Sequence, residues 1–207
     1  AGVVVLTSQI SGAFGEREAG IAFTFAGQAG VAIENARLFA EVQRLAVTDD
    51  LTGTHNRRHL LATAERELSR AQRFNRPLAA IILDIDEFKR VNDAHGHSVG
   101  DEVLRAVANR LRNGLREVDI LGRYGGEEFV IILPETDLLS AYEVAERLRS
   151  KIAAEPIATS AGPVSVTISL GVAAADPTTP DFASLLSRID DLLYTAKRRG
   201  RNRVVVG

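Results

Sequence analysis

The sequence contains no cysteine, no methionine and no tryptophan. The absence of cysteine excludes disulfide bonds, thiol catalysis and cysteine–zinc sites. No apolar run approaches the roughly 20 residues that a helix needs to cross a bilayer, and no signal-peptide layout opens the chain. Because the chain starts at Ala1 and has no methionine anywhere, we expect it to be a piece of a longer protein.

An excess of charge of either sign is also missing, since 25 basic residues stand against 27 acidic ones, for a net charge of -2. This balance argues against a chain-wide surface for nucleic acid but allows a local basic site. Hydrophobic residues make up 45% of the chain and charged residues 25%, which predicts a folded protein with a real core. The length of 207 residues suits one domain with an appendage, or two small domains.

The first 46 residues combine a short apolar run with a long segment that lacks proline. Gly2–Leu6 reads as a strand, either the last of a truncated domain or an edge strand that docks elsewhere, and residues 12–15 predict a turn. Residues at heptad spacing then predict a helix over 16–46. These are Val31, Asn35, Leu38, Val42 and Leu45. We expect a parallel dimerising helix with Asn35 fixing the register; an amphipathic helix packed on its own domain is the alternative.

The remaining residues, 47–207, alternate apolar β-like runs with helical patterns. The predicted strands are 78–83, 129–133, 164–170 and 204–206, and the predicted helices lie around 99–111, 141–153 and 182–197. The strand at 164–170 alternates apolar and polar residues, as a half-buried strand does. Such alternation of strands and helices implies a helix-covered sheet and, taken alone, favours parallel strands.

Gly125 and Gly126 separate two β-like runs and predict a tight hairpin turn, because the favoured two-residue turns need positive φ. Glu127 and Glu128 follow directly, before a strand that should be buried. Glycines let a ligand approach the backbone, and carboxylates beside them suit a phosphate-bearing ligand and its metal. A bare tight turn is an equal alternative.

Asp84 and Asp86 stand at the end of the strand predicted over 78–83, on one face of it. Ligands of open α/β sheets bind beyond the carboxyl ends of strands, so Asp84 and Glu127 would converge if this strand neighbours the hairpin. Oxygen donors without cysteine favour Mg²⁺ over zinc. Strand-end turn chemistry or a helix cap is the alternative for Asp84.

Polar residues cluster again between positions 89 and 101. Asn92 and Asp101 offer an amide oxygen and a carboxylate, which together can read the donor edge of guanine. Asp101 could equally be the N-cap of the following helix. His97 is either a metal ligand or a hydrogen-bond partner, and Lys89 is a point charge suited to a phosphate.

A basic cluster covers residues 197–203, where Gly200 is expected to end a helix. Lys197 and Arg201 could grip the distal phosphates of a triphosphate. A solvated face and a nucleic-acid patch are the alternatives, the latter disfavoured by the net charge.

Taken together, these segments resemble a GGDEF-type domain, the catalytic module of bacterial diguanylate cyclases, over about 47–207. The matching pieces are Asp50–Gly53 with Asn56–Arg58, Asp84–Lys89, Asn92–Asp93, Gly96–His97 with Gly100–Asp101, Gly125–Phe129, Ser169–Val172, and Ala196–Lys197 with Gly200–Asn202. Residues 1–46 are similar to the end of a GAF sensory domain followed by a linker helix, through Gly2–Phe14 and Ala32–Phe39.

The resemblance implies an α+β fold with a central, mostly antiparallel sheet flanked by helices, which overrides the parallel sheet favoured by alternation alone. It also implies that two GTP molecules condense into cyclic di-GMP and two pyrophosphates across a homodimer. Cytoplasmic placement follows from the supply of GTP. No nucleic-acid partner is expected.

The resemblance also implies a role for each matching residue. Asp84, the Ile85 carbonyl and Glu127 would hold Mg²⁺ or Mn²⁺, with Glu128 as a further ligand and Glu127 as the base for the ribose 3′-hydroxyl. The substrate would be contacted by Lys89, Asn92, His97, Asp101, Gly125, Gly126, Lys197 and Arg201, with Lys89 steadying transition-state charge.

Arg116 and Asp119, three residues apart, match the product-inhibition site of this family, and Arg147 would complete it. A plain salt bridge along a helix is the alternative. Thr54 and His55 depart from the larger apolar or aromatic residues usual there. A non-catalytic module that binds GTP or cyclic di-GMP is the rival function, and a structural dimerisation module a third, while intact Asp84, Glu127 and Lys89 favour the enzyme.

Overall fold

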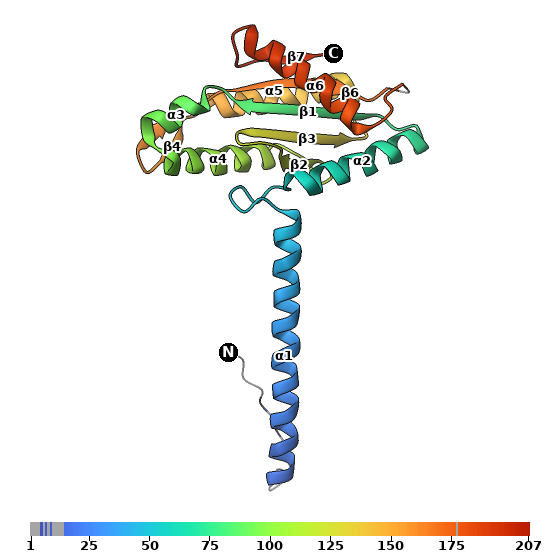
Figure 1. Ribbon diagram of the computed structural model, residues 1–207, viewed down its shortest axis with the longest axis vertical. Helices are drawn as coiled ribbons and strands as arrows, with labels where there is room; N and C mark the ends of the chain where they lie inside the picture. Colours follow the sequence, from blue (N-terminus) through green and yellow to red (C-terminus); the bar gives the residue numbers. More distant parts are fainter. Residues whose placement is uncertain (1–4, 6, 8, 10–14, 177) are drawn as a thin grey trace. The chain divides into compact units, whose positions relative to one another are not determined.

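The computed structural model describes residues 5, 7, 9, 15–176 and 178–207, and the chain forms two compact units, Ala1–Ala46 and Val47–Gly207 (Figure 1). The strand predicted at Gly2–Leu6 and the turn predicted at 12–15 lie, apart from Val5 and Gly15, outside the described residues. None of the described helices is both long and apolar enough to cross a membrane.

Helix α1 spans Glu16–Val47, which confirms the helix predicted from the heptad spacing. Two acidic residues, Glu16 and Glu18, lie in its first turn, where negative charge favours the helix dipole. The carboxylate of Glu18 also accepts the N–H of Gly15 at 2.9 Å. The side chains of Val42 and Leu45 lie outside the described part of this helix.

The second unit is built on a five-stranded sheet with the order β2-β3-β1-β6-β7. Its strands are β1 Leu78–Ile85, β2 Ile120–Arg123, β3 Glu128–Pro134, β6 Ile168–Ala174 and β7 Val204–Val206. All neighbours pair antiparallel except β6 with β7, which pair in parallel. The mostly antiparallel sheet is thereby confirmed, and the parallel sheet suggested by alternation alone is wrong, because β1 lies between β3 and β6, which both run opposite to it.

Helices cover both faces of this sheet (Figure 1). They are α2 Arg57–Phe74, α3 Phe88–His95, α4 His97–Arg112, α5 Leu138–Ala154 and α6 Phe182–Arg198. Successive residues of β1 point to opposite faces. Ile81 and Leu83 therefore pack in the core with α4 and α5, whereas Ala80 and Ile82 pack with α2 and α6.

The strand predicted at 164–170 is wrong in its bounds. A small hairpin of β4 Ile157–Thr159 and β5 Gly162–Val164 takes its first residue, and β6 begins only at Ile168. Strand β6 lies between β1 and β7 and is buried along almost its whole length, not half-buried. A central strand covered by helices on both faces does not need the alternation that the sequence pattern suggested.

Candidate active site

The candidate site lies where β1 ends and β3 begins. Asp84 is paired with Glu128 across the two strands, and the N–H of Ile85 donates to the carbonyl of Glu127 at 3.4 Å. The antiparallel pairing therefore brings Asp84, Ile85 and the two glutamates to one rim of the sheet, as the convergence predicted from the sequence required.

Asp84 is a buried carboxylate with a single lysine beside it. Its side chain is 6% exposed, and its Oδ2 lies 2.7 Å from Nζ of Lys197, which α6 supplies. Burial raises the pKa of Asp84 above its usual value, and the hydrogen bond and charge of Lys197 offset this only in part. The ammonium of Lys197 therefore supplies a positive charge directly beside the Asp84 carboxylate.

Glu127 and Glu128 share this environment. Burial raises the pKa of each glutamate, the negative charge of Asp84 raises it further, and Lys197 opposes both effects. Three carboxylates around one ammonium leave an excess of negative charge, which a divalent cation would relieve.

Within the described residues, no three histidine, aspartate or glutamate side chains lie close enough to hold a metal ion by themselves. Mg²⁺ is commonly bound through one or two carboxylates and completes its shell with water and substrate phosphates, so two of the three carboxylates at this rim would be enough for it. The residues present therefore suit a metal that arrives with a nucleotide.

The connection between β2 and β3 is a hairpin, but not the tight turn that was predicted. Residues 124–127 link the strands, and neither Gly125 nor Gly126 has positive φ. The N–H groups of Tyr124 and Gly125 both donate to the carbonyl of Glu128, at 2.8 and 3.3 Å. A Cβ on Gly125 would lie 2.3 Å from Oε2 of Glu128, whereas one on Gly126 would meet nothing within 4 Å. Close approach of a carboxylate, not backbone conformation, thus explains the first glycine.

Asp86 has a different environment from Asp84, two residues before it. It is 7% exposed, and its carboxylate accepts hydrogen bonds from the hydroxyls of Thr167 and Ser169, both at 2.6 Å, and from the N–H of Asn202 at 3.0 Å. Asp86 is therefore a structural anchor between the end of β1, the start of β6 and the loop after α6. The sequence assigned it no role, although the hydroxyl residues before β6 were a usable signal.

The loop anchored by Asp86 carries Arg201. The predicted helix end at Gly200 is confirmed, since α6 stops at Arg198 and Gly200 has a φ of 109°. Arg201 and Asn202 follow at φ 62° and 44°, a left-handed conformation that costs free energy for residues with a side chain. The positive charge of Arg201 also lowers the pKa of Asp84, which places it near the site.

Asn92 and Asp101 come from α3 and α4, which are separated by Gly96 alone. A Cβ on Gly100 would lie 1.9 Å from Oδ1 of Asn92, so the Asn92 amide lies against the backbone next to Asp101. The alternative role of Asp101 as an N-cap is wrong, because α4 already begins at His97, with Gly96 at the cap position. Lys89 and His97 are exposed on the same two helices.

The segment with Arg116 and Asp119 is a turn and not part of a helix, since α4 ends at Arg112. The helical salt bridge is therefore wrong: Oδ2 of Asp119 accepts the backbone N–H of Arg116 at 2.8 Å. Arg147 of α5 donates to the carbonyl of Gly114 in the same loop, at 3.0 Å. Arg116 itself is exposed.

Comparison with known proteins gives a consistent result. Residues 46–203 match the family model described as diguanylate cyclase, GGDEF domain. Response regulator PleD of Caulobacter vibrioides is 46% identical over 165 residues, which are 78% of this chain and 36% of PleD, so the chain spans about a third of that relative. The resemblance of residues 2–39 to a GAF domain stays a prediction.

Two solved structures extend the comparison. The coiled coil and GGDEF domain of DgcB from Caulobacter crescentus, in complex with c-di-GMP, is 28% identical with a TM-score of 0.82, and the match covers 90% of this chain and 99% of that one. The active GGEEF domain of a diguanylate cyclase from Vibrio cholerae is 38% identical with a TM-score of 0.69, covering 73% of this chain and 96% of that one.

Proposed function

Since the chain belongs to the diguanylate cyclase GGDEF-domain family, we propose that it condenses two GTP molecules into cyclic di-GMP and releases two pyrophosphates. The observation that carries the proposal is the meeting of Asp84, Glu127 and Glu128 with Lys197 at one rim of the sheet. Relatives named diguanylate cyclase and a GGDEF neighbour in complex with c-di-GMP support it.

Asp84, the carbonyl of Ile85 and Glu127 would hold Mg²⁺ or Mn²⁺, with Glu128 as a further ligand. Such a metal supplies charge stabilisation for the phosphates and makes a bound hydroxyl more acidic. Glu127 accepts the proton of the ribose 3′-hydroxyl.

The remaining residues position the substrate. Lys197, which pairs with Asp84 in this structure, would bind the terminal phosphates, and Arg201 would join it from the loop that Asp86 holds. Lys89 steadies charge on the reacting phosphate. Asn92 and Asp101 read the guanine edge with His97 beside them, while Gly125 and Gly126 leave room at the backbone. In-line attack depends on such positioning more than on covalent chemistry.

Each chain offers one such site, so the reaction needs a second copy. We expect α1 to supply the contact, because Val31 and Leu38 of its heptad seam are 63% and 55% exposed. The DgcB neighbour, which contains a coiled coil and a GGDEF domain, supports this arrangement. Product inhibition through Arg116, Asp119 and Arg147 would add a check on output.

The test is incubation of the chain with GTP and Mg²⁺, followed by chromatography of the products. Glu127→Gln should lower the rate of cyclic di-GMP formation by at least about 100-fold, since it removes a metal ligand and a general base. Glu135→Gln, just beyond the opposite end of β3, is the matched control and should keep the wild-type rate. Continued synthesis by the Glu127 variant would refute the assigned role.

The same experiment separates the rival function. A chain that binds GTP or cyclic di-GMP in calorimetry but forms no product with either Mg²⁺ or Mn²⁺ would be a binding module. A chain that binds neither nucleotide would be left with dimerisation alone.

A further inference from the structure

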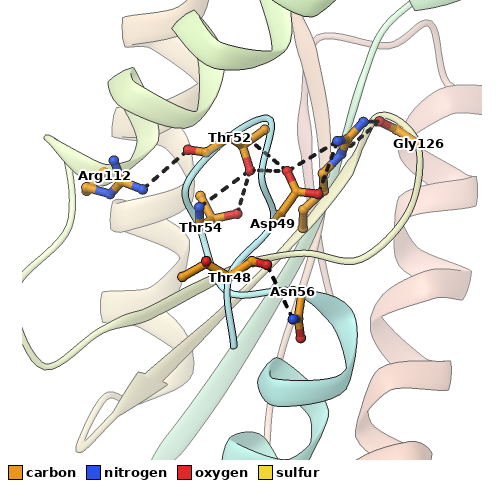
Figure 2. Close-up of polar contacts among 8 residues, drawn as sticks. Thr48, Asp49, Thr52, Thr54, Asn56, Arg112 and Gly126 are labelled. Atoms are coloured by element: carbon orange, nitrogen blue, oxygen red, sulfur yellow. Dashed lines mark hydrogen bonds and ion pairs between the residues drawn. The ribbon is translucent and has the colours of Figure 1, made fainter. Parts of the chain in front are cut away.

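Residues 48–55, which directly follow α1, form a turn closed by its own polar groups. We call this segment the entry turn. The carboxylate of Asp49 accepts the N–H and the hydroxyl of Thr52, at 2.9 and 2.7 Å, and the hydroxyls of Thr52 and Thr54 are 2.9 Å apart (Figure 2). Backbone bonds also join Asp49 with Gly53 and Thr54 at 2.8 Å. With both threonines buried, the entry turn is a well-defined unit.

Arg123, the last residue of β2, connects the entry turn to the hairpin of the candidate site. Its Nη1 lies 3.2 and 3.3 Å from the two carboxylate oxygens of Asp49. Its Nε and Nη2 donate to the carbonyl of Gly126, at 3.2 and 2.6 Å. One guanidinium therefore holds two segments that are far apart in the sequence, and its planar fork suits this bridging better than an ammonium would.

The ion pair between Arg123 and Asp49 is partly shielded from water. The two side chains are 18% and 24% exposed, so solvent screens their attraction less than at an open surface. Burial alone would raise the pKa of Asp49, but the hydrogen bonds of Thr52 and the charge of Arg123 bring it below the usual value. Asp49 is thus held as a carboxylate, the form that Arg123 needs.

The carbonyl that Arg123 holds belongs to the residue before Glu127. Gly126 has no side chain and open space around it, so its own packing does little to fix the peptide unit that joins it to Glu127. That peptide unit sets the direction in which the Glu127 side chain leaves the backbone. The carbonyl of Glu127 accepts the N–H of Ile85 in a long hydrogen bond of 3.4 Å.

We propose that Arg123 is a positioning residue for Glu127, and that Asp49 links Arg123 to the entry turn, which follows helix α1 in the chain. A change imposed on the chain where α1 ends would then reach the catalytic carboxylate through two side chains. This inference rests on the proposed function and adds a regulatory route to it.

Arg112 provides a matched control within the same structure. It donates to the carbonyl of Thr52 at 3.5 Å (Figure 2) and to the carbonyl of Gly53 at 2.8 Å, and so contacts the entry turn from the end of α4. Both of these hydrogen bonds end in the entry turn and not in the hairpin at Gly126. Arg112→Lys is therefore the same type of substitution at the entry turn, but it leaves the contacts of Arg123 with Asp49 and Gly126 in place.

The first measurement does not depend on activity. Amide hydrogen exchange of residues 124–128 is compared for the full chain and its Arg123→Lys, Asp49→Asn and Arg112→Lys variants. We expect exchange to become at least about tenfold faster in the first two variants and to stay unchanged in the third, because local opening controls exchange. Unchanged exchange in the Arg123 variant would overturn the proposal that Arg123 holds the hairpin, whether or not the chain makes product.

The second measurement is steady-state kinetics with GTP and Mg²⁺. For Arg123→Lys we expect kcat to fall about 10- to 100-fold with KM changed less than about twofold, since a small misplacement of a catalytic group slows chemistry while the nucleotide contacts remain. Arg112→Lys should match the wild type. Faster exchange with unchanged kcat would overturn the positioning role, whereas an inactive wild type would count against the proposed function instead.

The third measurement tests the coupling. If Asp49 acts through Arg123, the double variant should lose no more activity than Arg123→Lys alone, because contacting residues of one network are not additive. Losses that multiply would show that Asp49 acts by another route and would overturn the coupling. Thermal unfolding of every variant, monitored by circular dichroism, checks that each one folds.

Discussion

The apolar side chains of α1 and β1 differ in how far water reaches them. Every residue of β1 is buried. Along α1, Phe23 is 83% exposed and Ile33 69% exposed, and none of the side chains described in this helix is buried. The strand is covered by helices of its own unit, whereas the described part of the helix has no such cover.

This difference shows where each unit obtains its stability. The unit Val47–Gly207 buries a core on both faces of its sheet. Helix α1 contains Gly20, Gly27 and Gly30, each of which costs about 1 kcal/mol relative to alanine in a helix interior. A helix of this kind gains most from packing against another surface, which agrees with the proposed pairing of two copies.

The largest expected effect comes from replacing one glycine by alanine in each unit and comparing the two results. A Cβ on Gly171 of β6 would lie 2.1 Å from the carbonyl oxygen of Ile189 and 2.6 Å from the nitrogen of Leu193, both backbone atoms of α6. Gly171→Ala should therefore destabilise the second unit by about 3 kcal/mol or more. Gly30→Ala, with nothing within 4 Å, should be neutral or stabilising. Chemical denaturation measures both, and equal effects would contradict the contrast between the units.

The second prediction concerns the anchor below the site. Asp86→Asn puts an amide donor among the hydroxyl and N–H donors that now face the carboxylate. We expect a loss of about 2 kcal/mol and a Tm lower by about 4–8 °C, together with a higher KM for GTP because the loop with Arg201 is released. Asp93→Asn, exposed on α3, should change neither quantity. An unaltered KM for GTP would show that Asp86 contributes to stability but not to substrate binding.

The third prediction tests the uncovered helix. Leu38→Asp should raise the dimer dissociation constant at least about tenfold, because a charge in the seam must be buried without a partner. Activity should fall in parallel, while the Tm of the second unit stays constant. Ile33→Asp, outside the seam, should leave the dimer intact. Sedimentation velocity decides the matter, and persistent dimers of the Leu38 variant would exclude this seam.

The smallest expected effect is a pH dependence in the second unit. Burial lowers the pKa of His55, and the nearby charges of His59 and Arg112 lower it further. The unfolded chain therefore binds a proton more readily, so stability present above about pH 6.5 decreases as the pH falls toward the folded pKa. His55→Gln should flatten this part of the Tm profile. A profile unchanged by the substitution would mean that His55 does not titrate in this range.

Local patterns predicted the elements that carry their own signal. The heptad spacing gave α1, and the continuous apolar run at 78–83 gave the buried strand β1. The placement of Asp84 beside Glu128 could be expected only on the condition that the two strands are neighbours. That condition depends on long-range pairing, which alternation of strands and helices misjudged and the family resemblance supplied.

Features set by tertiary contacts could not be predicted. The role of Asp86 depends on Thr167, Ser169 and Asn202 arriving from elsewhere in the fold. The crowding at Gly125 comes from the carboxylate of Glu128, three residues later. The sequence did not indicate that Arg123 joins Asp49 to Gly126, because these two partners come together only after β2 has joined the sheet.

The direction of β1 relative to its neighbours has a practical consequence. Because β1 runs opposite to both β3 and β6, the rim where β1 ends is also the rim where those two strands start. The ends of three strands thus meet at the rim of the candidate site, while Leu78 and Pro134 lie at the far rim. A reporter domain spliced into the loop after Pro134 would sit a full strand length away from the candidate site.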